Sequence, residues 1–403
     1  MGISPWFMMG GRLKFKFRFK SLKEGAYRGY GPGMLLPEPL AMLEGSPIQR
    51  RFAALIAPKS NGELEAMAAE SRALTLRHFG RTIRMFAPLY LSNECINSCK
   101  YCGFARENPI VRVTLEVEEV AREARHLALE GFRNILLVAG EHPKFVSNGY
   151  LERCVARLRD EFPGISLEVG PMETADYAPL VRAGAEGLVV YQETYHRETY
   201  HELHTFGPKK DFDWRLACPV RAYDAGFRRI GIGALFGLWH WQDEATALAA
   251  HLEYLQKRCW KAQITVSMPR LRPAAGDFEP RHPLGDREFV QLLCALRICF
   301  PQTGIVLSTR ESPEFRDGLI PLGVTMISAG SHTEPGGYTG AGRGALHQTV
   351  RGRHVPLEIG ATVGATEQFV ISDARPAAEM VTALRRQGYE AVWKDWDQGI
   401  AGT

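Results

Sequence analysis

The 403-residue sequence has little of several features that would assign it to a specialised class of protein. No uninterrupted apolar run reaches the roughly 20 residues that a transmembrane helix needs, so we expect no membrane span. A net charge of +4 is too small to indicate a nucleic-acid partner. The eight cysteines are unevenly spaced, which argues against a secreted disulfide framework and for a reducing compartment. With 45% hydrophobic and 23% charged residues, the composition suits a globular enzyme of the cytoplasm.

Three of the cysteines lie together in one short loop. Cys95, Cys99 and Cys102 follow an apolar run at residues 86–91, with the spacing C-x3-C-x2-C. Thiolates at this spacing can hold three irons of a cubane iron–sulfur cluster, which leaves the fourth iron without a protein ligand in the motif. A structural zinc site would need a fourth Cys or His nearby, and none follows at ligand spacing. A zinc or redox role and a chance group of thiols are the alternatives, although the other five cysteines scatter singly.

The N-terminal residues 1–45 differ from the rest of the chain. Residues 12–20 alternate cationic and apolar side chains, which is the period of a strand. A transit peptide, an edge strand and a tail from an early start codon all fit this pattern, and we expect a poorly ordered extension. Residues 46–84 show helical spacing and are predicted to form a helical lead-in.

Apolar strands then alternate with helical segments. The eight predicted strands are 86–91, 133–140, 165–169, 187–192, 230–235, 263–268, 304–309 and 324–329. The predicted helices between them are 116–130, 148–162, 174–183, 212–225, 243–258, 286–300 and 312–320. This alternation predicts a (β/α)8 TIM-type barrel over residues 85–335, followed by a small appendage at 336–403. An open doubly wound sheet is the alternative, but no G-x-G-x-x-G follows the first strand.

Polar residues end every predicted strand, and in such a barrel the active site lies at the carboxyl ends of the strands. Any one of these residues alone is more often a helix cap. Together they predict a site at one end of the barrel.

Several strings resemble the 2-iminoacetate synthase family, the radical S-adenosylmethionine (SAM) tyrosine lyases of thiamine biosynthesis. They are the cysteine loop, with an aromatic residue before its last Cys, and the segments 88–93, 138–142, 191–196, 269–273, 307–313 and 392–397. The resemblance covers about residues 50–397. It implies a radical SAM barrel with a [4Fe-4S] cluster whose open iron binds SAM. It also implies cleavage of the Cα–Cβ bond of L-tyrosine to 2-iminoacetate (dehydroglycine) and p-cresol, with SAM giving 5′-deoxyadenosine and methionine.

The resemblance implies which residues hold the cofactors. The three loop cysteines bind the cluster. The residues expected around SAM are Tyr101 at the adenine, Gly140 and Glu141 at the amino group, Glu193 at the ribose and Arg215 at the carboxylate.

Arg310 is the best candidate to hold the tyrosine carboxylate, because a guanidinium grips a carboxylate by two parallel bonds. Ser308 or Ser328 can add a hydroxyl donor. The local alternatives are that Arg310 pairs with Glu311 or Glu314, and that the serines are packing residues at strand ends.

The product implied by the resemblance is an imine that water hydrolyses to glyoxylate. The resemblance implies two partners, the thiazole synthase subunit that receives this product and a reducing donor of the flavodoxin or ferredoxin type. In the appendage we predict a strand at 368–373, a helix at 376–387 and a second strand at 388–393. Its aromatic residues offer a docking surface for the synthase, or Trp393 and Trp396 pack against the bottom or side of the barrel and close it, which is the interpretation we favour.

Three rival functions are weighed against this one. The tyrosine lyase of hydrogenase maturation carries a second cluster in its C-terminal domain, whereas no Cys follows Cys299 here. A tryptophan lyase, or an aromatic amino-acid lyase of another cofactor pathway, would differ mainly in the substrate pocket. An iron–sulfur electron carrier or scaffold would need neither an open iron nor Glu and Arg at the strand ends.

Overall fold

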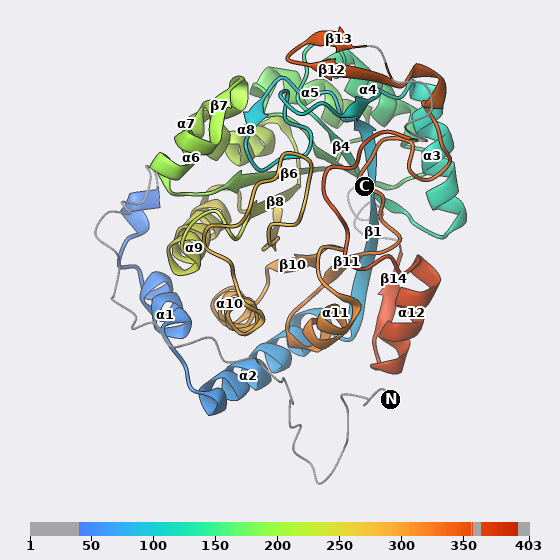
Figure 1. The fold of residues 1–403 in the computed structure, drawn as a ribbon. Coiled ribbons are helices and arrows are strands. Elements are labelled where there is room, and N and C mark those ends of the chain that lie inside the picture. Colours follow the sequence, from blue (N-terminus) through green and yellow to red (C-terminus); the bar gives the residue numbers. More distant parts are fainter. Residues whose placement is uncertain (1–39, 356, 358–363, 394–403) are drawn as a thin grey trace.

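The computed structural model describes residues 40–355, 357 and 364–393 (Figure 1). Eight parallel strands form a closed barrel, because the last strand of the series pairs with the first. Their bounds are β1 Thr82–Ser92, β4 Asn134–Ala139, β5 Gly164–Glu168, β6 Gly187–Glu193, β8 Arg229–Ala234, β9 Gln263–Ser267, β10 Gly304–Leu307 and β11 Met326–Ser328. The predicted barrel and its eight strands are confirmed, and the alternative of an open sheet is wrong.

Helices surround the barrel (Figure 1). They are α3 Val117–Leu129, α4 Asn148–Leu158, α5 Thr174–Ala183, α6 Arg197–Leu203, α7 Phe212–Leu216, α8 Cys218–Ala225, α9 Trp241–Arg258, α10 Asp286–Cys299 and α11 Pro313–Leu319. The strands are apolar along their length because the barrel core covers one face and the helices cover the other. Leu137, Leu167 and Leu188, on three neighbouring strands, are fully buried.

One predicted helix, at residues 212–225, is in fact two. Helix α7 ends at Leu216, and α8 begins at Cys218 with Pro219 in its first turn. Proline has no N–H to donate and its ring obstructs the preceding turn, so it is favoured in the first turn of a helix and destabilising in the interior.

The N-terminal part of the described chain is helical, as expected. Helix α1 spans Pro47–Ile56 and α2 spans Asn61–Phe79, and α2 begins with a capping box between Ser60 and Glu63. Both helices pack against α10. The predicted extension, with its alternating segment at 12–20, lies outside the described residues except for a short 3-10 turn at Leu40–Leu43.

The C-terminal part adds strands at two places. β12 (His347–Val350) pairs with β13 (Arg353–Val355) and with β3 (Val111–Arg112). β14 (Glu390–Val392) runs parallel to the start of β1, and α12 (Ala377–Arg386) lies beside it (Figure 1). The predicted helix and second strand of the appendage are confirmed.

The strand predicted at 368–373 is wrong, because none of these residues belongs to a strand. Their backbone N–H groups bond to Thr333, Pro273 and Thr309 in separate loops rather than to a neighbouring strand. Trp393 packs edge-on against Phe132, with ring centroids 5.2 Å apart, and its carbonyl accepts a hydrogen bond from Asn134. This contact favours the plug over the docking surface for Trp393, while Trp396 lies outside the described residues. Within the described ranges, no helix is long and apolar enough to cross a membrane.

Candidate active site at the carboxyl ends of the strands

The cysteine loop leaves the carboxyl end of β1 and is held against the barrel by short backbone pairings. β2 (Ser98–Cys99) pairs with β7 (His204–Phe206), which places Cys99 opposite His204. Gly140, at the end of β4, lies so close that an added Cβ would clash with the carbonyl of Glu94. Glycine therefore allows the loop to approach β4 closely.

The surroundings of the three thiols suit metal-bound thiolates. All three are free, and burial and the neighbouring thiols raise the pKa values of Cys95 and Cys99. N–H donors nevertheless meet the sulfurs: Asn97 places its backbone N and Nδ2 at 3.5 and 3.7 Å from Cys95 Sγ. Bound iron would stabilise the thiolates that burial and mutual repulsion disfavour. The chemistry of the loop therefore suits a cluster, although no group of His, Cys, Asp or Glu side chains in the described residues is placed to hold a single metal ion.

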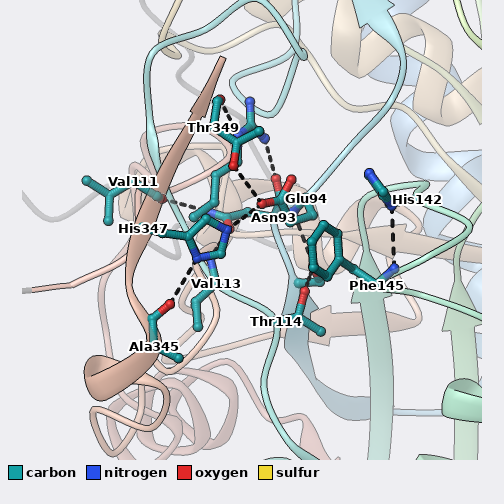
Figure 2. A network of polar contacts seen from close by, with 12 residues as sticks. Asn93, Glu94, Val111, Val113, Thr114, His142, Phe145, Ala345, His347 and Thr349 are labelled. Carbon is teal, nitrogen blue, oxygen red and sulfur yellow. Dashed lines mark hydrogen bonds and ion pairs between the residues drawn. The ribbon is translucent and has the colours of Figure 1, made fainter. Parts of the chain in front are cut away.

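A polar network fixes the two residues that precede Cys95 (Figure 2). The carboxylate of Glu94, which is 2% exposed, lies 2.7 Å from His347 Nε2 and accepts a 3.3 Å bond from Thr349. Asn93 bonds to the backbone of Val111 and Val113 with both ends of its amide, at 2.9 and 2.8 Å. The network thereby ties the cysteine loop to β3 and β12.

Tyr101, within the cysteine loop, belongs to a buried cluster of side chains. Its hydroxyl is 2.7 Å from His204 Nε2, and His204 Nδ1 is 2.7 Å from the carbonyl of Tyr200. Because a carbonyl only accepts, Nδ1 carries the proton and Nε2 accepts from the phenol. Burial lowers the pKa of His204 to about 3, which agrees with a neutral ring.

Glu193 and Arg215 lie next to each other. The family resemblance assigns both of them to SAM. Glu193 has a left-handed backbone (φ 71°) at the end of β6, a conformation that costs energy for a residue other than glycine. Its carboxylate accepts from Lys209 Nζ at 2.7 Å and from Arg215 Nη2 at 3.5 Å. Burial raises the pKa of Glu193, but the two cations lower it overall. Sequence reasoning missed Lys209, which no motif marks.

Gly140 and Glu141 line a separate cavity together with His142 and Gly170, and its empty volume of about 560 Å³ includes its open side. Glu141 accepts a 2.7 Å bond from Asn97 Nδ2 through its carboxylate and a 2.8 Å bond from the N–H of Ile96 through its carbonyl. The predicted amino-group site therefore adjoins the cysteine loop.

A second cavity lies inside the mouth of the barrel and has an empty volume of about 740 Å³, which includes its open end. The three predicted substrate residues, Arg310, Ser308 and Ser328, all line it. Arg310 has no carboxylate within ion-pair distance in the described part of the chain. Glu311 is held instead by Arg270 and by Arg272, the latter at 2.7 Å, so the alternative of an Arg310–Glu311 pair is wrong.

Further groups complete this cavity. Burial and the nearby Glu193 raise the pKa of Glu168 to about 7. The hydroxyl of Ser331 is buried without a hydrogen-bond partner among the described residues. The cavity is also lined by Tyr90, Tyr191, Gln368 and Phe369. The Arg310 Cζ atom lies over the Phe369 ring, 3.4 Å from its centroid. The strand-end positions of Glu168 and Ser331 were visible in the sequence, whereas nothing marked Gln368.

Comparisons with known proteins agree with this geometry. Residues 89–248 match the Radical SAM superfamily, and residues 267–390 match the Biotin and Thiamin Synthesis associated domain. The chain is 42% identical over 345 residues to the 2-iminoacetate synthase of Escherichia coli (strain K12), covering 85% of this chain and 86% of that protein. It is 41% identical over 348 residues to the enzyme of the same name from Salmonella typhimurium (strain LT2), covering 86% and 87%.

Among solved structures, the chain is similar to the crystal structure of HydG, a maturase of the [FeFe]-hydrogenase. The TM-score is 0.75 and the identity 31%, and the match covers 86% of this chain and 75% of that chain.

Proposed function

This chain belongs to the 2-iminoacetate synthase family of radical SAM enzymes. From this we propose which residues at the mouth of the barrel bind the cofactors and which bind the substrate. It is a lyase that cleaves the Cα–Cβ bond of L-tyrosine to 2-iminoacetate and p-cresol in the biosynthesis of the thiazole moiety of thiamine. Its cofactors are a [4Fe-4S] cluster and SAM, which supply a 5′-deoxyadenosyl radical when bound.

We assign the cofactors to the side of the mouth near β4 and β6. Cys95, Cys99 and Cys102 hold three irons, and the residues around SAM are Tyr101, Gly140, Glu141, Glu193 and Arg215. The support is that all five adjoin the cysteine loop or one another. Lys209 bonds to Glu193 and, through its backbone N–H, to Asn97 Oδ1 at 2.9 Å, so it links the ribose site to the loop.

Tyrosine binds in the 740 Å³ cavity, with its carboxylate on Arg310. The observation that carries this assignment is a half-buried guanidinium on the cavity wall without a carboxylate partner among the described residues, because a charge partly removed from water is costly unless a ligand pairs with it. Glu168, on the wall of the same cavity, supplies an acceptor for the substrate ammonium. Ser308 and Ser328 offer hydroxyl donors near the carboxylate.

We also propose two partners and a compartment. The imine product is lost to hydrolysis in water, which favours direct transfer to the thiazole synthase subunit. Reduction of the cluster requires a donor, for which a flavodoxin or ferredoxin is suited. All eight cysteines are free, which suits a reducing compartment such as the cytoplasm.

Arg310→Lys tests the substrate site, because it keeps the charge but loses the bidentate fork. We expect tyrosine affinity, measured by calorimetry on the cluster-free protein, to fall by about tenfold or more, the factor for a lost charge-assisted bond. In the reconstituted enzyme, p-cresol should fall more than tyrosine-independent SAM cleavage. Arg281→Lys is the matched control, since Arg281 is exposed and pairs with Glu202.

Arg215→Ala should instead lower SAM cleavage and p-cresol together. Equal effects of the Arg310 and Arg215 variants on both products would overturn the division of the mouth into cofactor and substrate sides.

A further inference from the structure

Gln368 lies between the substrate cavity and a ligand of the cluster. Its Oε1 accepts a 2.8 Å hydrogen bond from the hydroxyl of Tyr90, which lines the same cavity. Its Nε2 lies 3.9 Å from Cys102 Sγ, within hydrogen-bond distance of a sulfur acceptor. One side chain therefore contacts both the wall of the substrate cavity and the cysteine loop.

The backbone around Gln368 is fixed from several directions. Its N–H donates to the carbonyl of Thr333 at 2.9 Å, and an added Cβ on Gly103 would clash with its carbonyl. Two residues on, the N–H of Val370 donates to Pro273 at 2.9 Å. The backbone that carries the Gln368 side chain is thus held in place by contacts with three different loops.

The hydrogen bonds along this path all run in one direction. A phenol donates its proton while its oxygen accepts another, and an amide accepts at oxygen and donates at nitrogen. The Tyr90 hydroxyl donates to Gln368, and Gln368 donates to Cys102. Such chains strengthen cooperatively, because each donor polarises the next. Hydrogen bonds to the sulfurs are among the factors that set the reduction potential of an iron–sulfur cluster.

We propose that Gln368 is a positioning residue that couples tyrosine binding to the reduction potential of the cluster. The substrate ammonium, a donor-only group, donates to Tyr90 Oη and thereby strengthens the bond from Gln368 to Cys102. Tyrosine then raises the midpoint potential, so that electron uptake is favoured once the substrate is in place. The inference rests on the proposed binding of tyrosine beside Arg310.

Two substitutions interrupt the path at different links. Gln368→Met has nearly the same shape but no amide, and Tyr90→Phe removes only the hydroxyl. Gln348→Met is the matched control, because the Gln348 amide donates to the Pro109 carbonyl at 2.7 Å and is not among the contacts to sulfur. Midpoint potentials are measured by EPR-monitored titration of the reconstituted proteins, with and without saturating tyrosine.

We expect tyrosine to raise the potential of the wild type and of Gln348→Met. Gln368→Met should have a more negative potential without tyrosine, and neither it nor Tyr90→Phe should respond to tyrosine. In cluster-free protein, tyrosine should change the alkylation rate of Cys102 by about fivefold, the factor for one ordinary hydrogen bond, and Gln368→Met should abolish this change.

Calorimetry separates failure of this inference from failure of the proposed function. A Gln368→Met protein that binds tyrosine but keeps the wild-type potential and the wild-type response would overturn the coupling. If Gln368→Met does not bind tyrosine, the Tyr90→Phe variant decides. A wild-type change in its midpoint potential on adding tyrosine would overturn the coupling. Undiminished tyrosine affinity in Arg310→Lys would overturn the substrate site itself.

Discussion

Cys95, Cys99 and Cys102 share a loop at the mouth of the barrel, whereas Cys154 and Cys259 are buried elsewhere. Burial raises the pKa of each of the latter two thiols to about 11, as expected for structural cysteines that stay protonated. Replacing any loop cysteine by Ala should remove the brown chromophore or abolish 5′-deoxyadenosine formation. Cys154→Ala should keep the iron content and the activity, and iron loss equal to that of Cys99→Ala would refute the ligand assignment.

The pair of Glu94 and His347 offers a second test at the residue scale. His347→Phe leaves the buried Glu94 carboxylate without this partner, at an expected cost of about 1–3 kcal/mol in the free energy of unfolding. Urea denaturation of the cluster-free protein measures this cost, and iron content after reconstitution reports on the loop. His126→Phe is the control, because His126 lies half-exposed beside Glu130 on α3. Wild-type stability and iron content in His347→Phe would show that the network does not hold the loop.

Glu244 predicts how stability depends on pH. It is fully buried and accepts from Thr194 and from the N–H of Tyr195, and burial raises its pKa to about 8. Between pH 4.5 and 8 the folded state holds a proton that the unfolded state releases, so the contribution of Glu244 to stability falls as pH rises. The contribution of Glu244 to the free energy of unfolding falls by up to about 1.4 kcal/mol per pH unit.

Urea unfolding of wild type and Glu244→Gln at pH 6 and pH 8 isolates this contribution. The wild type should lose more stability than the variant over that interval. Parallel pH profiles would mean that Glu244 titrates alike in the folded and unfolded states.

At the scale of elements, the sequence predicted all eight barrel strands. It predicted only part of the C-terminal appendage at 336–403. A strand covered on both faces is apolar throughout, so the eight apolar runs were visible without knowledge of their partners. The helix at 212–225 fits one apolar period, and only the position of Pro219 reveals the break.

The segment at 368–373 has strand-like residues but no strand partner. Gln368, Val370 and Ser372 donate to Thr333, Pro273 and Thr309, which lie in three different loops. Long-range bonds to separate loops leave no periodic pattern in a sequence, which is why the contribution of Gln368 to the cavity was missed. The substrate residues Arg310, Ser308 and Ser328 could be found because the end of a barrel strand is recognisable.

Truncation after Gly388 tests the role of β14. It removes the pairing with Thr82–Arg84, the buried Tyr389 and the packing of Trp393 on Phe132. We expect an insoluble or strongly destabilised protein, as measured by soluble yield and thermal unfolding. A soluble, cluster-loaded protein that makes p-cresol but no longer co-purifies with the thiazole synthase would contradict the plug and support docking.

For the whole molecule, the barrel mouth brings together cofactor and substrate residues from distant parts of the chain. The cysteine loop follows β1, the cofactor residues lie near β4 and β6, and the substrate residues lie at the carboxyl ends of β10 and β11. The tail then crosses the mouth and adds Gln368 and Phe369 to the cavity. Both family matches, at 89–248 and 267–390, therefore contribute to one site.

The most direct test of tyrosine cleavage at this mouth is an anaerobic incubation of the reconstituted protein with SAM, dithionite and either tyrosine or tryptophan. Chromatography follows p-cresol, 5′-deoxyadenosine and glyoxylate, the hydrolysis product of 2-iminoacetate. We predict p-cresol and glyoxylate in equal amounts from tyrosine, no cleavage of tryptophan, and neither product with Cys99→Ala. Cleavage of tryptophan with tyrosine left intact, or p-cresol formation by Cys99→Ala, would contradict this account.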